Sequence, residues 1–156
     1  MEKSVFITGA TVNTGLGIAE KFAKEGYNLF LGSRNAENAE KTAKELSEKY
    51  GVYAKGYGMK IFDEENTKEI FTDIKNSGYS VDTLVLNAAN LGIRQQFFDV
   101  SIDDFMNVIN TNIGWNFMLS REAAIQMKEN GGGSIVFVNS NTAYRAIPDR
   151  IAYSAS

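Results

Sequence analysis

The 156-residue sequence contains no cysteine and no histidine. Without cysteine, the chain forms no disulfide bond and has no thiolate nucleophile. Without histidine, it lacks the commonest general base and the commonest metal ligand. Acid–base chemistry must therefore come from tyrosine, lysine, aspartate or glutamate, and we expect no metal site.

A basic surface and a long apolar run are also missing. The chain has 16 lysines and arginines against 19 acidic residues, so its net charge is -3, and its pI is near 5.1. This balance argues against a nucleic-acid partner. No apolar run approaches the ~20 residues of a membrane-spanning helix. We therefore expect a cytoplasmic protein that contacts neither nucleic acid nor membrane.

Short apolar runs alternate with amphipathic stretches along the whole chain. Strands are predicted at residues 4–7, 27–32, 52–57, 82–86 and 134–139. Helices are predicted between them, at residues 15–25, 36–50, 63–76 and 101–129, the last with one break. Strands separated by helices pair in parallel, because a parallel crossover needs about a dozen residues or more. The pattern predicts an α/β fold with a doubly wound parallel sheet in one domain, residues 1–156.

A glycine-rich turn follows the first predicted strand, with the sequence Thr-Gly-Ala-Thr-Val-Asn-Thr-Gly-Leu-Gly at residues 8–17. Its glycines permit a positive φ and a close approach of the backbone to a ligand. The helix that follows presents free N–H groups and a partial positive charge to a pyrophosphate. A turn with a structural role only is the alternative, but the strand-turn-helix order is what a dinucleotide-binding (Rossmann-like) turn requires.

This turn resembles the signature of the short-chain dehydrogenase/reductase family, in which Thr-Gly precedes Gly-x-Gly. The present turn is two residues longer than the usual one, as in the related enoyl-carrier-protein reductases. A second stretch, after the fourth strand, resembles the family motif Asn-Asn-Ala-Gly. From these two stretches the resemblance implies cofactor contacts by Gly9, Thr14, Gly15, Leu16, Gly17, Asn87, Ala88 and Ala89.

The residues after the second strand bear on which nicotinamide cofactor is bound. The resemblance aligns Ser33 and Arg34 with the position where an acidic residue would bind the adenosine ribose and repel a 2′-phosphate. A serine hydroxyl and a guanidinium would instead bind that phosphate, which favours NADP(H) over NAD(H). Lys60 aligns with an aspartate that touches the adenine in the family, so we expect that contact to be absent or altered.

Three polar residues match the catalytic pattern of the family. Tyr153 begins the sequence Tyr-Ser-Ala-Ser, which resembles the start of the motif Tyr-x-x-x-Lys, and Ser140 precedes it by 13 residues, which is the family spacing. Asn112 matches the family's helix asparagine, although Trp115 stands where a glycine is usual. The resemblance implies that Tyr153 donates or accepts the proton, Ser140 binds the substrate oxygen and Asn112 holds a water of the proton relay.

The resemblance predicts an oxidoreductase that transfers a hydride between NADP(H) and a small carbonyl or alcohol substrate. The position of the motif's lysine follows Ser156, so we expect an incomplete C-terminal part, little activity from residues 1–156 alone and a homo-oligomer for the full-length protein. A catalytically silent nucleotide-binding regulator or scaffold of the same fold is the alternative. A methyltransferase is a third, which would not need Ser140 and Tyr153 at this spacing.

Overall fold

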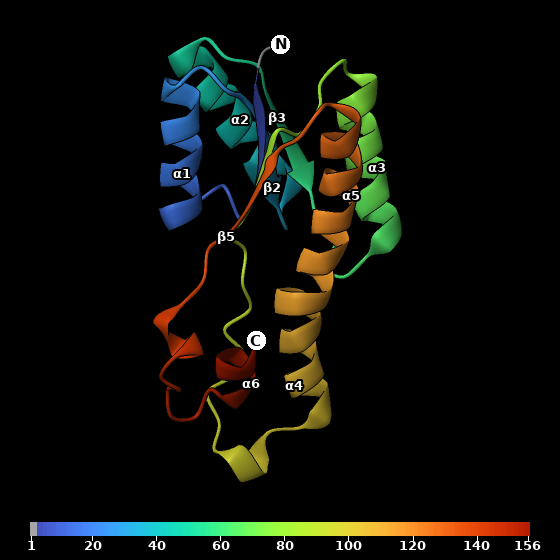
Figure 1. Cartoon of the computed structure of the whole chain (residues 1–156). Coiled ribbons are helices and arrows are strands. Elements are labelled where there is room, and N and C mark those ends of the chain that lie inside the picture. Colours follow the sequence, from blue (N-terminus) through green and yellow to red (C-terminus); the bar gives the residue numbers. More distant parts are fainter. Residues whose placement is uncertain (1–2) are drawn as a thin grey trace.

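The computed structural model describes residues 3–156 and contains one five-stranded parallel sheet with helices on both faces (Figure 1). The strand order is β3-β2-β1-β4-β5, so the chain winds outward from β1 in both directions. This doubly wound, Rossmann-like arrangement is the predicted fold class. The strands are β1 (Ser4–Thr8), β2 (Asn28–Ser33), β3 (Ala54–Gly58), β4 (Thr83–Leu86) and β5 (Ser134–Phe137).

The helices lie close to their predicted places. They are α1 (Asn13–Lys24), α2 (Ala36–Tyr50), α3 (Glu64–Asn76), α4 (Ile102–Ile109), α5 (Asn116–Glu129) and the short α6 (Ile151–Ala155). Side chains at the N-caps explain where three of them begin: Asn35, Asp63 and Ser101 accept the N–H of the residue three positions on, at the starts of α2, α3 and α4. The break predicted within residues 101–129 is a π-helical segment, Asn110–Trp115, between α4 and α5.

The core has two layers, one on each face of the sheet. Helices α1 and α2 cover one face, where Ile7, Leu31 and Ala19 are fully buried. Helices α3 and α5 cover the other face, where Phe6 packs edge-on against Phe71 with 5.5 Å between the ring centroids. Strand β1 contributes to both layers because neighbouring side chains of a strand point to opposite faces.

The two edges of the sheet differ. At the β3 edge, the Glu40 carboxylate of α2 accepts the outward N–H of Gly56 at 3.0 Å. A Cβ on Gly56 would lie 2.2 Å from the backbone nitrogen of Glu40, so the helix rests directly on this strand. At the other edge, β5 and the residue after it expose Val136, Phe137 and Val138. Within residues 3–156, β5 is thus an open edge with exposed apolar side chains.

Beyond the carboxyl ends of the strands, α4, α6 and the loops before them form the lower part of the molecule in Figure 1. This is where a parallel α/β sheet places its ligands. Helix α6, which carries Tyr153, has only five residues and packs against α4. The site therefore depends on how this lower part is held to the sheet.

Candidate active site

A cleft of about 1110 Å³ opens at the carboxyl ends of the central strands. Its volume is slightly above the range of most ligand pockets in proteins, which is roughly 300–1,000 Å³. The glycine turn forms one wall, the ends of β2 and β3 another, and the segment after β4 a third. Of the predicted cofactor residues, those that line it are Gly9, Thr14, Gly15, Ser33, Arg34, Asn87, Ala88 and Ala89.

Close packing of the glycine turn against the segment after β4 explains two of these residues. A Cβ on Gly15 would lie 2.0 Å from the carbonyl oxygen of Gly9 and 2.7 Å from Nδ2 of Asn87. The Asn87 side chain donates to the carbonyls of Thr8 and Gly9 at 3.1 and 3.2 Å. The Thr8 hydroxyl in turn accepts the N–H groups of Asn87 and Ala88, each at 3.0 Å. These contacts fix the shape of the turn and leave only a glycine possible at position 15.

Helix α1 begins at this turn and differs from α2, α3 and α4 at its start. Its N-cap, Val12, makes no side-chain hydrogen bond, and no acidic residue lies in its first turn. Asn13 has a positive φ of 48°, a left-handed conformation that favours glycine and that asparagine adopts more readily than most other residues. The first N–H groups of α1 thus lack a side-chain acceptor at the wall of the cleft, where a phosphate oxygen could accept them.

Ser33 and Arg34 line the cleft at the end of β2. The Ser33 hydroxyl accepts the N–H of Asn35 at 3.3 Å, which leaves its own hydrogen free to donate. Arg34 is exposed, and within residues 3–156 no carboxylate lies within ion-pair distance of it. Its guanidinium is free to bind an anion in the cleft.

A second, smaller hollow of about 90 Å³ adjoins the cleft. Ala88 and Ala89 border both spaces, and the smaller one is also lined by Asn112, Ser140 and Tyr153. The three predicted catalytic residues therefore come together from the π segment, the end of β5 and α6. The Ser140 hydroxyl accepts the N–H of Thr142 at 3.3 Å and keeps its hydrogen free for a substrate oxygen.

The side chain of Asn112 is occupied by protein groups. Its Oδ1 accepts the N–H of Asn90 at 2.8 Å, and its Nδ2 donates to the Asn90 carbonyl at 3.0 Å and to the Ser156 hydroxyl at 2.8 Å. Its backbone carbonyl accepts from Nδ2 of Asn116 at 2.8 Å. Asn112 thus joins the segment after β4 to the C-terminal segment, while its role toward a water stays a prediction.

Some predicted residues lie away from the cleft. Leu16 packs into the apolar layer under α1, and Gly17 is exposed with open space where a Cβ would be. Lys60 is exposed and does not line the cleft, whereas its neighbours Met59 and Ile61 do. At this place the lining of the cleft is therefore apolar, and the altered contact with the adenine stays a prediction.

Sequence reasoning missed several residues that border the cleft. Trp115, noted only as a departure from the family pattern, is 2% exposed and lines it. The apolar strand end at residues 57–61 was the available signal for Met59 and Ile61. Five others gave no signal. Asn90, Leu91 and Gly92 lie in the loop after β4, which has no regular pattern, and Asn107 and Thr111 lie on the long helix, where the π segment decides which residues face the cleft.

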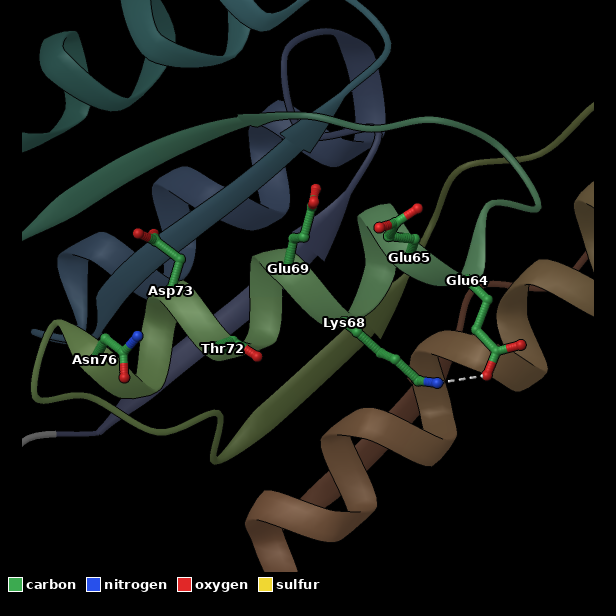
Figure 2. Close-up of a pocket in the computed structure, with 7 residues that line it drawn as sticks. All are labelled: Glu64, Glu65, Lys68, Glu69, Thr72, Asp73 and Asn76. Atoms are coloured by element: carbon green, nitrogen blue, oxygen red, sulfur yellow. Dashed lines mark ion pairs between the residues drawn. The ribbon is translucent and has the colours of Figure 1, made fainter.

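A third hollow, along the outer side of α3, is an open surface groove with a largely acidic lining (Figure 2). Two of its carboxylates are paired: Glu64 with Lys68 at 2.8 Å, as Figure 2 shows, and Asp73 with Lys55 at 2.7 Å. The hydrogen bond from Lys55 holds the pKa of Asp73 below its usual range. Burial, helped by the hydrogen bond to Asp73, raises the pKa of Tyr57 above its ordinary value. We interpret the groove as a solvated helix face.

In residues 3–156 there is neither a helix long and apolar enough to cross a membrane nor a cluster of acidic side chains placed to hold a metal ion. Residues 3–156 match the family described as short chain dehydrogenase. The chain belongs to the short-chain dehydrogenase family. The two-layered fold, the glycine turn and the grouping of Asn112, Ser140 and Tyr153 agree with that membership.

Individual relatives show the extent of the similarity. The chain is 30% identical over 156 residues to the 3-oxoacyl-[acyl-carrier-protein] reductase of Aquifex aeolicus, covering 99% of this chain and 62% of that protein. An alcohol dehydrogenase from the archaeon Thermococcus sibiricus, complexed with 5-hydroxy-NADP, has a TM-score of 0.90 at 28% identity, covering 99% of this chain and 65% of that one. A 7α-hydroxysteroid dehydrogenase complexed with NADH has a TM-score of 0.90 at 30% identity, covering 99% and 59%. The chain thus spans less than two thirds of the length of these relatives.

Proposed function

We propose that the protein is an oxidoreductase that moves a hydride between NADP(H) and a small carbonyl or alcohol substrate. The observation that carries this proposal is the shared wall between the two hollows. Ser140, Tyr153 and Asn112 line the smaller space, and Ala88 and Ala89 join it to the cleft of the glycine turn. A substrate beside Tyr153 would therefore lie next to a nicotinamide at the inner end of the cleft.

The residues of the chain have separate tasks in this reaction. The bound dinucleotide supplies or accepts the hydride at the substrate carbon. During reduction, the Ser140 hydroxyl donates a hydrogen bond to the carbonyl oxygen and polarises it, and the Tyr153 hydroxyl delivers the proton to that oxygen. The tyrosinate left behind regains its proton from solvent, so the net change is a carbonyl plus hydride plus proton to an alcohol. Oxidation runs through the same groups in reverse.

The choice of NADP(H) rests on Arg34. Its guanidinium borders the cleft and has no carboxylate partner in the part of the chain that the structure describes. Relatives with NADP and with NADH in their structures are both similar to this chain, so the family does not decide the preference. We expect NADPH to bind at least about tenfold more tightly than NADH, a difference of about 1.4 kcal/mol. Arg34→Ala should remove the preference and Arg94→Ala, an exposed arginine outside the cleft, should keep it.

Substituting the tyrosine tests the chemistry. Tyr153→Phe in the complete protein should abolish turnover of ketones with NADPH and leave NADPH affinity within about twofold, since the lost hydroxyl acts on the substrate. Tyr144→Phe is the matched control, because Tyr144 lies in the same segment and is 96% exposed. Turnover by Tyr153→Phe at the wild-type rate would remove Tyr153 from the mechanism. A wild-type protein that binds NADPH but reduces no ketone or sugar would support the silent regulator instead.

A further inference from the structure

Helix α6 presents Tyr153 to the substrate hollow but has little means of holding itself in place. It has five residues and no side-chain hydrogen bond at its N-cap, Arg150. Helices this short are unstable without external contacts, because nucleation is unfavourable. The residue before the cap, Asp149, has a positive φ of 62°, a left-handed conformation that is unfavourable for most side chains. Contacts outside the helix must therefore fix the position of Tyr153.

Arg150 supplies the most direct of these contacts. Its Nη1 donates to the backbone carbonyls of Leu91 at 2.7 Å and Gly92 at 3.1 Å. Both acceptors lie in the segment after β4, and both residues line the cofactor cleft. In residues 3–156 no carboxylate forms an ion pair with Arg150, so its charge is directed to these two carbonyls. A charged donor makes a stronger hydrogen bond than a neutral one.

The surroundings of this contact are closely packed. The N–H of Gln95 donates to the Asp149 carbonyl at 3.0 Å, a second tie between the same two segments. The hollow that Arg150 borders between α4 and α6 is only about 10 Å³, too small to hold a substrate. Arg150 therefore faces protein groups and is not placed to bind a ligand itself.

We propose that Arg150 is a positioning residue, which fixes Tyr153 relative to the residues that line the cofactor cleft. This inference rests on the proposed function and goes beyond it, because it assigns the placement of Tyr153 to one side chain. Losing the two hydrogen bonds lets α6 shift relative to Leu91 and Gly92, while the glycine turn and Arg34 keep their places. The rate of the catalytic step should fall, because a displacement of the Tyr153 hydroxyl by about 1 Å is enough to slow proton transfer strongly.

The experiment compares Arg150→Ala with Arg145→Ala in the complete protein. Arg145 lies in the same segment, is exposed, and its side chain makes no hydrogen bond or ion pair in residues 3–156, so its substitution removes the same charge and no contact. We expect Arg150→Ala to lower kcat about tenfold or more, with NADPH affinity within about twofold of wild type. Arg145→Ala should leave both quantities unchanged.

Three further measurements separate positioning from folding. Added guanidinium ion should restore part of kcat in Arg150→Ala and not in Tyr153→Phe, and Arg150→Lys, with a single charged group, should give an intermediate kcat. Hydrogen exchange at residues 149–156 should accelerate in Arg150→Ala while exchange in β1 stays slow. A kcat within about twofold of wild type in Arg150→Ala, or a rate loss that guanidinium does not relieve, would overturn the proposal. Absence of turnover in the wild-type protein would instead refute the proposed function.

Discussion

Substituting Gly15 by alanine tests the geometry of the glycine turn. The new Cβ would lie 2.0 Å from the Gly9 carbonyl oxygen and 2.7 Å from Nδ2 of Asn87, neither of which can move freely. Overpacking of this kind costs roughly 1–3 kcal/mol. Displacing the Asn87 amide also weakens its two hydrogen bonds, to Thr8 and Gly9, at about 1 kcal/mol each. Alanine regains about 1 kcal/mol as the better helix former.

The sum predicts that Gly15→Ala destabilises the folded protein by roughly 2–4 kcal/mol. For a domain of about 150–250 residues this lowers the Tm by about 4–16 °C. NADPH affinity should fall as well, because the turn that carries the first N–H groups of α1 is displaced. The assay is thermal unfolding by circular dichroism, with an NADPH titration of the protein that remains folded.

Gly17→Ala is the matched control in the same helix. A Cβ there meets no atom within 4 Å, so this variant should be as stable as wild type or more stable by up to about 1 kcal/mol. If Gly17 allows a close approach of the cofactor, its NADPH affinity should nevertheless fall. A Gly15→Ala protein with unchanged Tm and unchanged affinity would refute the reasoning about the turn, and unchanged affinity in Gly17→Ala would remove Gly17 from the cofactor site.

Two more properties can be measured directly. Trp115 is the only tryptophan in the sequence and lines the cleft. NADPH should therefore quench its fluorescence by energy transfer to the reduced nicotinamide. An unchanged emission at saturating NADPH would place the cofactor elsewhere. The lowered pKa of Asp73 means that its contact with Lys55 stabilises the fold above about pH 4 and is lost as the pH falls through the pKa of the folded state. Asp73→Asn should therefore lower the free energy of unfolding by up to about 1 kcal/mol at pH 7, a small value because the Asp73 side chain is 45% exposed and its ion pair is screened by solvent. The difference in stability from wild type should shrink below about pH 4, which acid unfolding of the two proteins measures.

The order of the elements could be predicted from the sequence because each strand is a short apolar run bounded by turn residues. Caps such as Asn35 and Asp63 placed helix starts to within a residue or so. The glycine turn was informative for a steric reason: Gly15 has no space for a side chain. Gly17 is a glycine of the same motif but has open space where a Cβ would lie. The sequence alone could not distinguish a glycine that steric contacts require from one that they do not.

The finer geometry of the site depends on contacts between distant segments. A break was predicted in the long helix, but its π form, at Asn110–Trp115, was not, and that form turns Trp115 toward the cleft. The role of Asn112 toward a water stays a prediction, but the bridge that its side chain makes between Asn90 and Ser156 was not predicted. Such pairings join residues 22 or 44 positions apart and have no local signature. Arg150 gave no signal for the same reason.

The contact between Glu40 and Gly56 has a consequence for how this sheet can grow. The outward N–H of Gly56 already has its acceptor in the Glu40 carboxylate, and the backbone of α2 lies directly against the face of β3 at this residue. An unrelated extended peptide therefore finds one backbone donor of β3 already paired, which makes this edge a poorer template for amyloid-like pairing. Strand β5 has no such cover in residues 3–156. An additional strand, from the same polypeptide or from another, therefore meets the less protected edge of the sheet beside β5.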